Sequence, residues 1–226
     1  MDHKHAPFHN PAAVASYASD TTRKVPGLAD LHRMVMLLLA EGAPGNAHIL
    51  VVGAGGGMET GAMAEAQPDW RFTGVDPSPA MLDLARQTLT PFAERVDLLQ
   101  GTIEQAPAGP FDGATCLFTL HHLDRNDRLK TLEGIRSRLA PGTRLVVAEH
   151  APPGPDPARW MALSVAFGDR EGPDWGKAAA AGRMTTERLP LLTPAQEENM
   201  LREAGFTDVE LYYAAFSFRG WVGTAS

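Results

Sequence analysis

The feature that most restricts the fold is a short apolar run that leads directly into a glycine-rich loop. Residues 48–52 read HILVV, and residues 53–57 read GAGGG. A continuous apolar run of this length, bounded by turn residues, is typical of a strand buried on both faces of a parallel sheet. Glycines let the following chain adopt conformations that a side chain forbids and approach a ligand closely. The sequence therefore predicts a parallel sheet with a ligand-binding loop after one strand.

Strand-like and helix-like segments alternate along most of the chain, which indicates a doubly wound α/β fold. One helical stripe, Leu129-Leu132-Ile135-Leu139, is expected to end at Pro141-Gly142. Two closely joined segments near the end are expected to pair as antiparallel strands. The prediction is a Rossmann-like, mostly parallel seven-stranded sheet with a C-terminal antiparallel hairpin. Its expected strands are residues 48–52, 71–75, 96–100, 111–117, 144–148, 209–213 and 216–222.

The length of 226 residues fits a single domain, residues 1–226, that can bury its own core. Residues 10–45 are expected to form N-terminal capping helices, because leucines and methionines recur there at helical spacing. Four prolines interrupt the chain shortly after residue 150. Residues 151–190 are therefore interpreted as a lid-like insertion over the ligand-binding edge of the sheet.

Composition excludes several classes of function. Twenty Lys and Arg against 27 Asp and Glu give a net charge of −7, which repels phosphate backbones and argues against a nucleic-acid partner. A single cysteine excludes a disulfide framework, and His3, His5 and His9 have no acidic partner, so no metal is expected. The longest apolar run, residues 34–40, is too short to span a bilayer. We expect a cytoplasmic protein without a membrane partner, in which the 34–39 stripe packs in the core or forms a homodimer face.

An acidic residue ends the second expected strand. Asp76 follows Gly53 by 23 residues, and an acid at this place reaches two ribose hydroxyls. The loop and the acid together predict a site for an adenosine ligand; a tight turn without a ligand is the alternative. Met58 stands where the dinucleotide fingerprint has its third glycine, which argues against a nicotinamide oxidoreductase. The loop is not followed by Lys and Ser or Thr, so it is not a P-loop.

Four segments resemble the motifs of class I S-adenosylmethionine-dependent methyltransferases, and the resemblance extends over residues 17–222. They read HILVVGAGGGMET, FTGVDPSPAML, FDGATCLFTLHHL and LAPGTRLVVAEH. The resemblance implies an enzyme that uses S-adenosyl-L-methionine as cofactor. It implies methyl transfer to a small-molecule acceptor, whose identity these motifs do not indicate. A module that binds the cofactor without turnover is a further alternative.

The resemblance also assigns residues to the cofactor. Gly53, Ala54 and Gly55 would approach its methionine part, and Asp76 with Pro77 would hold the ribose. Family members often carry an acid against the adenine, where this chain has Thr102-Ile103; the Thr102 hydroxyl or the backbone would take that role. Three residues are expected to cover or wall the adenosine: Tyr17, Met81 and Phe118. For Tyr17, packing in the core is the alternative.

A narrower resemblance is to carboxy-S-adenosylmethionine synthases, which use a modified reaction on the cofactor itself. It is carried by Val25-Pro26-Gly27, LFTLHHL and LYYAAFSFRGWV. Leu28 stands where those enzymes have a cofactor-contacting Tyr, and Leu117 where they have Asn. A carboxylate-binding Arg would lie near Arg183. These departures favour common ancestry over a shared reaction, and such a non-methylating reaction is the alternative function.

The candidate catalytic residues are His121, His122 and Glu149. Both histidines follow the fourth expected strand and Glu149 lies at the end of the fifth, at the edge where such sheets bind ligands. Methyl transfer needs a base only when the nucleophile must lose a proton. The alternative for each residue is a place at the start of a helix or in a hydrogen-bonded wall of the site.

Overall fold

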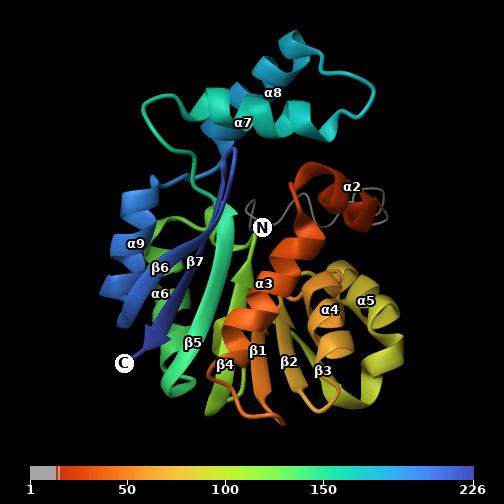
Figure 1. The fold of residues 1–226 in the computed structure, drawn as a ribbon, viewed down its shortest axis with the longest axis vertical. Helices are drawn as coiled ribbons and strands as arrows, with labels where there is room; N and C mark the ends of the chain where they lie inside the picture. Colours follow the sequence, from red (N-terminus) through yellow and green to blue (C-terminus); the bar gives the residue numbers. More distant parts are fainter. Residues whose placement is uncertain (1–13, 15) are drawn as a thin grey trace.

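A computed structural model describes residue 14 and residues 16–226 of the chain; the predictions on His3, His5 and His9 and on part of the 10–45 segment lie outside these residues. The seven strands form one sheet in the order β3-β2-β1-β4-β5-β7-β6 (Figure 1). Neighbours among the first five strands are parallel, whereas β7 pairs antiparallel with both β5 and β6. The strands are β1 (His48–Val52), β2 (Arg71–Asp76), β3 (Val96–Gln100), β4 (Phe111–Leu117), β5 (Leu139–His150), β6 (Phe206–Ala215) and β7 (Phe218–Ala225).

Helices connect the strands, as expected, and several of them begin after a capping residue that is recognisable in the sequence. Ser78 and Thr193 cap helices whose first residue is proline, and Asp124 caps a third, because each side chain accepts a backbone N–H of the first turn. The helices are α2 (Tyr17–Lys24), α3 (Leu28–Ala40), α4 (Met58–Ala66), α5 (Pro79–Thr88), η2 (Thr90–Arg95), η3 (Ile103–Gln105), η4 (Leu120–His122), α6 (Arg125–Arg136), α7 (Pro157–Gly168), α8 (Trp175–Arg188) and α9 (Pro194–Glu203).

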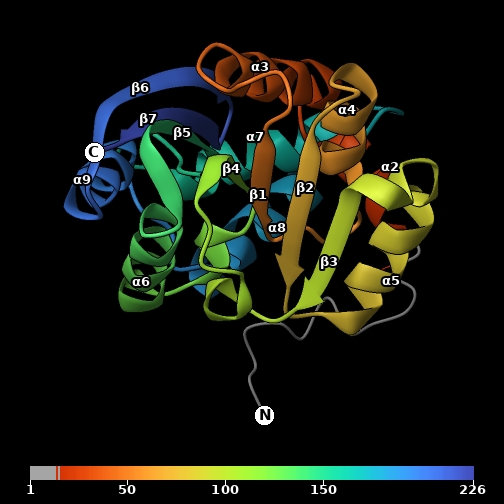
Figure 2. The same ribbon diagram turned by 90° about the horizontal axis from the view of Figure 1, so that it is seen from below.

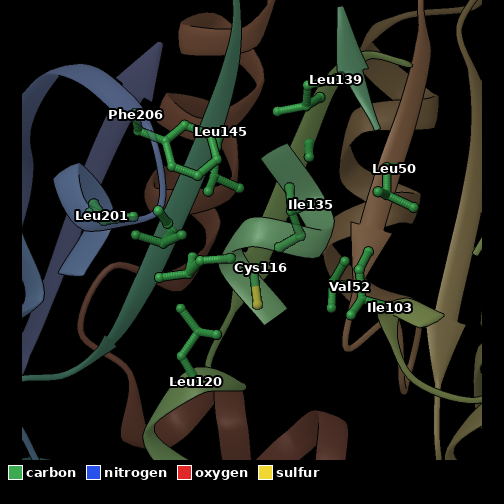
Figure 3. Packing of buried hydrophobic residues seen from close by; sticks show 14 of the residues in the cluster. Leu50, Val52, Ile103, Cys116, Leu120, Ile135, Leu139, Leu145, Leu201 and Phe206 are labelled. Carbon is green, nitrogen blue, oxygen red and sulfur yellow. The ribbon is translucent and has the colours of Figure 1, made fainter. Parts of the chain in front are cut away.

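The sheet separates two apolar cores. Figure 2 shows α3 and α4 on one side of the sheet and α6 on the other. On the α6 and α9 side, side chains of both helices pack against alternate residues of β4, β5 and β7, and Figure 3 shows Ile135, Leu145 and Leu201 among them. On the α3 and α4 side, Leu31, Val35 and Met63 pack against the intervening strand residues. This burial of both faces explains why the β1 sequence is apolar at consecutive positions.

The fold prediction is confirmed, with one correction at β5. The sequence placed Leu139 in the preceding helical stripe and began the strand at residue 144. Helix α6 instead ends at Arg136, and β5 begins at Leu139, which is paired with Phe111 of β4. Pro141 and Gly142 lie within the ladder irregularity between this pair and the next, Gly113 with Arg144. Proline and glycine therefore marked a bulge in a strand rather than the end of a helix.

Residues 151–190 contain α7 and α8, which pack against each other and lie above the edge at which the parallel strands end (Figure 1). A Cβ on Gly182 of α8 would come within 2.6 Å of the Ala158 carbonyl oxygen of α7, so the two helices approach closely. Helix α7 also contacts α2. Within the described part of the chain, every helix is too short or too polar to cross a membrane.

Candidate active site

A cavity of about 610 Å³ lies at the carboxyl ends of β1, β2 and β4. Its size is within the usual range for a small-molecule site, and parallel sheets of this kind bind ligands at this edge. Ala54 is buried and does not line the cavity. The other residues that the sequence assigned to the cofactor all do: Tyr17, Gly53, Gly55, Asp76, Pro77, Met81, Thr102, Ile103 and Phe118.

The Asp76 carboxylate is held in place at the cavity wall by the backbone. Its Oδ2 accepts the Gly55 N–H at 3.0 Å, and its Oδ1 accepts the Ser78 N–H at 2.8 Å. One of these donors comes from the glycine loop and the other from the start of α5. The two bonds fix the carboxylate between the loop and the helix, where it can accept hydroxyl donors of a ligand.

The glycine loop forms a wall of bare backbone. A Cβ on Gly53 would lie 1.9 Å from Thr119 Oγ1, and one on Gly55 would lie 2.7 Å from Asp76 Oδ2. A Cβ on Gly56 would lie 2.7 Å from the Tyr17 ring, so this ring rests on the loop. Gly53 and Gly56 also have a φ of +80°, which favours glycine. The loop is therefore packed too closely against Thr119, Asp76 and Tyr17 to carry side chains, and Gly53 and Gly55 present main chain to the cavity.

The predicted adenine contact, Thr102, lies at the end of the cavity away from the glycine loop, and its hydroxyl already has partners in the protein. The Thr102 hydroxyl donates to Gln105 Oε1 at 3.2 Å and accepts the Glu104 N–H at 3.4 Å, because it caps η3. The cavity continues past this point to polar residues that the sequence did not indicate, since they come from α6 and its end: Asp127, Lys130, Thr131 and Arg138.

Phe118 lies at the end of β4 with a backbone conformation that is unusual for its residue type. Its φ is +56°, its N–H donates to the Ala148 carbonyl at 2.6 Å, and its ring meets Phe218 edge-on with centroids 5.6 Å apart. Positive φ in a bulky residue is costly and persists only where surrounding contacts impose it. These contacts direct the chain after β4 so that Phe118 and Thr119 border the cavity.

Of the three candidate catalytic residues, only His122 lines the cavity. The His121 and His122 ring centroids are 4.4 Å apart, and the His150 N–H donates to His121 Nδ1 at 3.3 Å. His150 Nδ1 is 2.8 Å from Ser217 Oγ, which is 2.6 Å from Ser164 Oγ of α7. Burial lowers the pKa of His121 well below its usual range and that of His150 to about 3, so both rings are neutral. This polar chain connects the cavity wall to α7.

Glu149 lies outside the cavity, in a cluster that we call the ionic cluster: Arg128, Glu149 and Glu197. Arg128 of α6 is fully buried and forms a salt bridge with Glu197 of α9. Arg128 Nη2 also donates to the Pro190 carbonyl at 3.1 Å. Burial and the neighbouring Glu197 raise the pKa of Glu149, while Arg128 opposes that rise. The sequence did not indicate this cluster because its members are 21 to 69 residues apart.

Glu59 is a second residue that the sequence analysis missed. It follows Met58 in the first turn of α4, and Thr115 Oγ1 of β4 donates to its Oε1. Burial raises the pKa of Glu59 to about 8, although the Thr115 hydrogen bond lowers it. Its place two residues after the glycine loop was the available signal. Among the described residues, no group of three or more His, Cys, Asp or Glu is arranged to hold a metal ion.

Comparisons with known proteins agree with this architecture. A family model for a methyltransferase domain matches residues 50–145. Carboxy-S-adenosyl-L-methionine synthase of Chromohalobacter salexigens is 29% identical over 216 residues, which are 92% of this chain and 80% of that protein. The structure of PigF with SAH matches with a TM-score of 0.66 and 19% identity over 97% of this chain. Human N-acetylserotonin methyltransferase in complex with SAM matches with a TM-score of 0.61 and 19% identity over 100% of this chain.

These matches confirm the predicted resemblance and the fold class. The methyltransferase domain model over residues 50–145 agrees with the predicted enzyme class and with S-adenosyl-L-methionine as its cofactor. The chain spans only 61% and 63% of the two solved chains, so their likeness covers the fold and not their further parts. The individual contacts to the cofactor and the catalytic role of His122 stay predictions.

Proposed function

We propose that this chain, a class I S-adenosylmethionine-dependent methyltransferase by fold and domain family, transfers a methyl group to a small-molecule acceptor. S-adenosylmethionine would supply the methyl group of its sulfonium: the acceptor nucleophile would attack the methyl carbon in line, the carbon–sulfur bond would break, and S-adenosylhomocysteine would leave as a thioether. The observation that supports the proposal best is the Asp76 carboxylate, held by the Gly55 and Ser78 N–H groups at the wall of the 610 Å³ cavity. A carboxylate placed there would accept the ribose hydroxyls.

The other residues of the site have separable tasks. Gly53 and Gly55 would let the amino-acid arm of the cofactor pass along the main chain, and Met81 with Ile103 would provide apolar contact for the base. Much of the rate enhancement of such a displacement comes from holding the reactants in line. We place the acceptor between the N-terminal helices and residues 151–190, with His122 beside it. His122 would orient the acceptor or accept its proton.

The alternative is a reaction that modifies the cofactor, as in carboxy-S-adenosyl-L-methionine synthase, the name of a relative that matches 92% of the chain. A carboxylated cofactor would require a cation near the sulfonium. The Lys and Arg that line the described cavity, Lys130 and Arg138, lie at its α6 end, away from the glycine loop. Arg183 is exposed on α8 and lines neither that cavity nor the smaller one beside it. This distribution of charge favours methyl transfer.

Calorimetric titration with S-adenosylhomocysteine tests the cofactor site. The wild-type chain should bind it, and Asp76→Ala should weaken binding by about 30-fold or more, as expected for loss of a charge-assisted hydrogen bond. Asp83→Ala in α5 is the matched control, since Asp83 is exposed and pairs only with the nearby Arg86 in the described structure. No binding at high micromolar ligand, or equal affinity in Asp76→Ala, would contradict the site. Mass spectrometry of a copurifying ligand separates the two reactions, because carboxy transfer leaves a carboxylated sulfonium.

A further inference from the structure

A second, much smaller cavity adjoins the glycine-loop end of the main one, and we call it the side chamber. Its volume is about 20 Å³, enough for a single group the size of a water molecule. The two cavities share Tyr17, Gly53, Gly55, Leu117 and Phe118, so a ligand that follows the glycine loop reaches the chamber. The chamber therefore lies where the end of an extended ligand would be placed.

Four polar side chains converge on the side chamber, and they come from three helices. They are Tyr17 and Thr21 of α2, His32 of α3 and Glu59 of α4. No Lys or Arg lines the chamber in the part of the chain that the structure describes. Burial lowers the pKa of His32 to about 4 and raises that of Tyr17 to about 12, so both are neutral at pH 7. Glu59 is thus the group that can give the chamber a charge, and that charge is negative.

Glu59 has few internal partners for that charge. The Glu59 carboxyl accepts a hydrogen bond from the Thr115 hydroxyl. Burial disfavours the charged form of Glu59 and raises its pKa to about 8. Burial raises the pKa of Tyr17 on α2 and Tyr212 on β6, and the negative charge of Glu59 adds to each rise. A cation within about 4–6 Å favours the charged form of an acid. The site therefore suits a small cation brought by a ligand.

The direction in which the cofactor lies determines which of its positively charged groups would reach the side chamber. Asp76 stands between the two ends of the main cavity, with residues 101–103 on one side and Gly53 and Gly55 on the other. With the ribose at Asp76 and the base against residues 101–103, the amino-acid arm must run along the glycine loop. This arm carries one positively charged nitrogen at its end, an ammonium group that fits the volume of the chamber.

We propose that Glu59 is the anionic partner of the ammonium group of the cofactor, and that the side chamber selects for this amine. The proposal rests on the proposed function, because it requires the ribose to lie at Asp76. Thr115 positions the carboxyl from β4, while the α2 residues Tyr17 and Thr21 close the chamber from the opposite side. Glu59 is a binding residue in this proposal and takes no part in the transfer of the methyl group.

A comparison of two ligands and three proteins tests the proposal. The ligands are S-adenosylhomocysteine and its deamino analogue, which keeps the carboxylate and lacks the amine. The proteins are the wild type, Glu59→Gln and Glu65→Gln, the last an exposed acid on the same helix α4. The wild type and Glu65→Gln should bind S-adenosylhomocysteine about tenfold or more tighter than the analogue, as expected for a hydrogen bond to a charged group. Glu59→Gln should lose that preference.

The affinity of Glu59→Gln for the deamino analogue reports on the integrity of the variant's site. We expect it to match that of the wild type, since glutamine has the same shape and can still accept the Thr115 hydroxyl. A Glu59→Gln variant that keeps the preference for the amine, or that loses both ligands equally, would overturn the assignment. Wild-type protein that binds S-adenosylhomocysteine without preferring the amine would also overturn it, yet would leave the proposed function standing. Binding of neither ligand by the wild type would remove both proposals.

Discussion

Acidic side chains are fully or partly buried in two places of the chain, and the two environments differ in what neutralises the acids. In the ionic cluster, Glu197 forms a salt bridge with the fully buried Arg128, and Glu149 lies beside both. At the side chamber, Glu59 has the Thr115 hydroxyl and borders an opening to the main cavity. One environment contains its own cation and joins α6 to α9, whereas no Lys or Arg of residue 14 and residues 16–226 lines the other. On the proposal above, the first environment holds a charge that stabilises the fold, and the second holds one that would pair with a ligand.

The largest effect that tests this comparison should come from removing the internal cation. Arg128→Leu leaves Glu149 and Glu197 buried without their counter-charge, and loss of one partner of a buried pair costs about 3–5 kcal/mol. Urea unfolding measures the change in the free energy of unfolding. Arg125→Leu on the same helix is the control, because Arg125 pairs with Glu203 while both side chains are 45% or more exposed. That exposed pair should contribute at most about 1 kcal/mol.

Similar losses in Arg128→Leu and Arg125→Leu would contradict the structural role of the ionic cluster. The double variant Arg128→Leu/Glu197→Leu sharpens the test, since removing both partners avoids an unpaired charge and should recover part of the lost stability. Affinity for S-adenosylhomocysteine, measured on the folded variants, should stay near that of the wild type, because neither residue lines the cavity.

The second prediction concerns Glu59, whose replacement by glutamine should raise the free energy of unfolding at pH 8, whereas Arg128→Leu should lower it. Its pKa in the folded chain, about 8, is above the ordinary value of 4.5, so the folded state holds a proton that the unfolded state releases. That contribution to stability is present in full below pH 4.5 and is lost as pH rises toward 8. Between pH 6 and 8 it should lower the free energy of unfolding of the ligand-free chain by about 2 kcal/mol.

Urea unfolding of the wild type, Glu59→Gln and Glu65→Gln at pH 6 and pH 8 measures this contribution. Other groups titrate in the same range, so the informative quantity is the difference in slope between Glu59→Gln and the other two proteins. Glu59→Gln should be the more stable protein at pH 8, in contrast to the loss expected for Arg128→Leu. Equal slopes in all three proteins would show that Glu59 ionises normally and would remove the contrast between Glu59 and the ionic cluster.

The two regions also differ in how far the sequence predicted them. The glycine loop and Asp76 were found because each directly follows an apolar strand, and parallel strands bring their carboxyl ends together. Glu59 follows the same loop, but this place alone does not reveal its environment, because its hydrogen-bond partner Thr115 is 56 residues further along. Arg128 and Glu197 are 69 residues apart, and no local pattern relates them. Leu139 was misplaced for a related reason: pairing with β4 decided its conformation.

The smallest effect should come from the neutral polar chain that joins the cavity wall to α7. Ser164 Oγ accepts the Ser217 N–H at 3.3 Å and lies 2.6 Å from Ser217 Oγ, and both serines are buried. Ser164→Ala leaves a buried N–H without this acceptor, which costs about 1–2 kcal/mol and leaves no unpaired charge. Amide hydrogen exchange should show faster opening of α7, and Ser137→Ala, a change at an exposed serine, should not.

This last variant tests whether the lid-like segment is coupled to the cofactor site or only packed against its surroundings. Burial lowers the pKa of His150 and His121, so both rings are neutral. Removing the Ser164 hydroxyl therefore changes no charge along the polar chain from His122 to Ser164. Affinity for S-adenosylhomocysteine should therefore change less than twofold, an effect of at most about 0.4 kcal/mol. A tenfold loss of affinity would mean that α7, through this polar chain, holds the cavity wall in place.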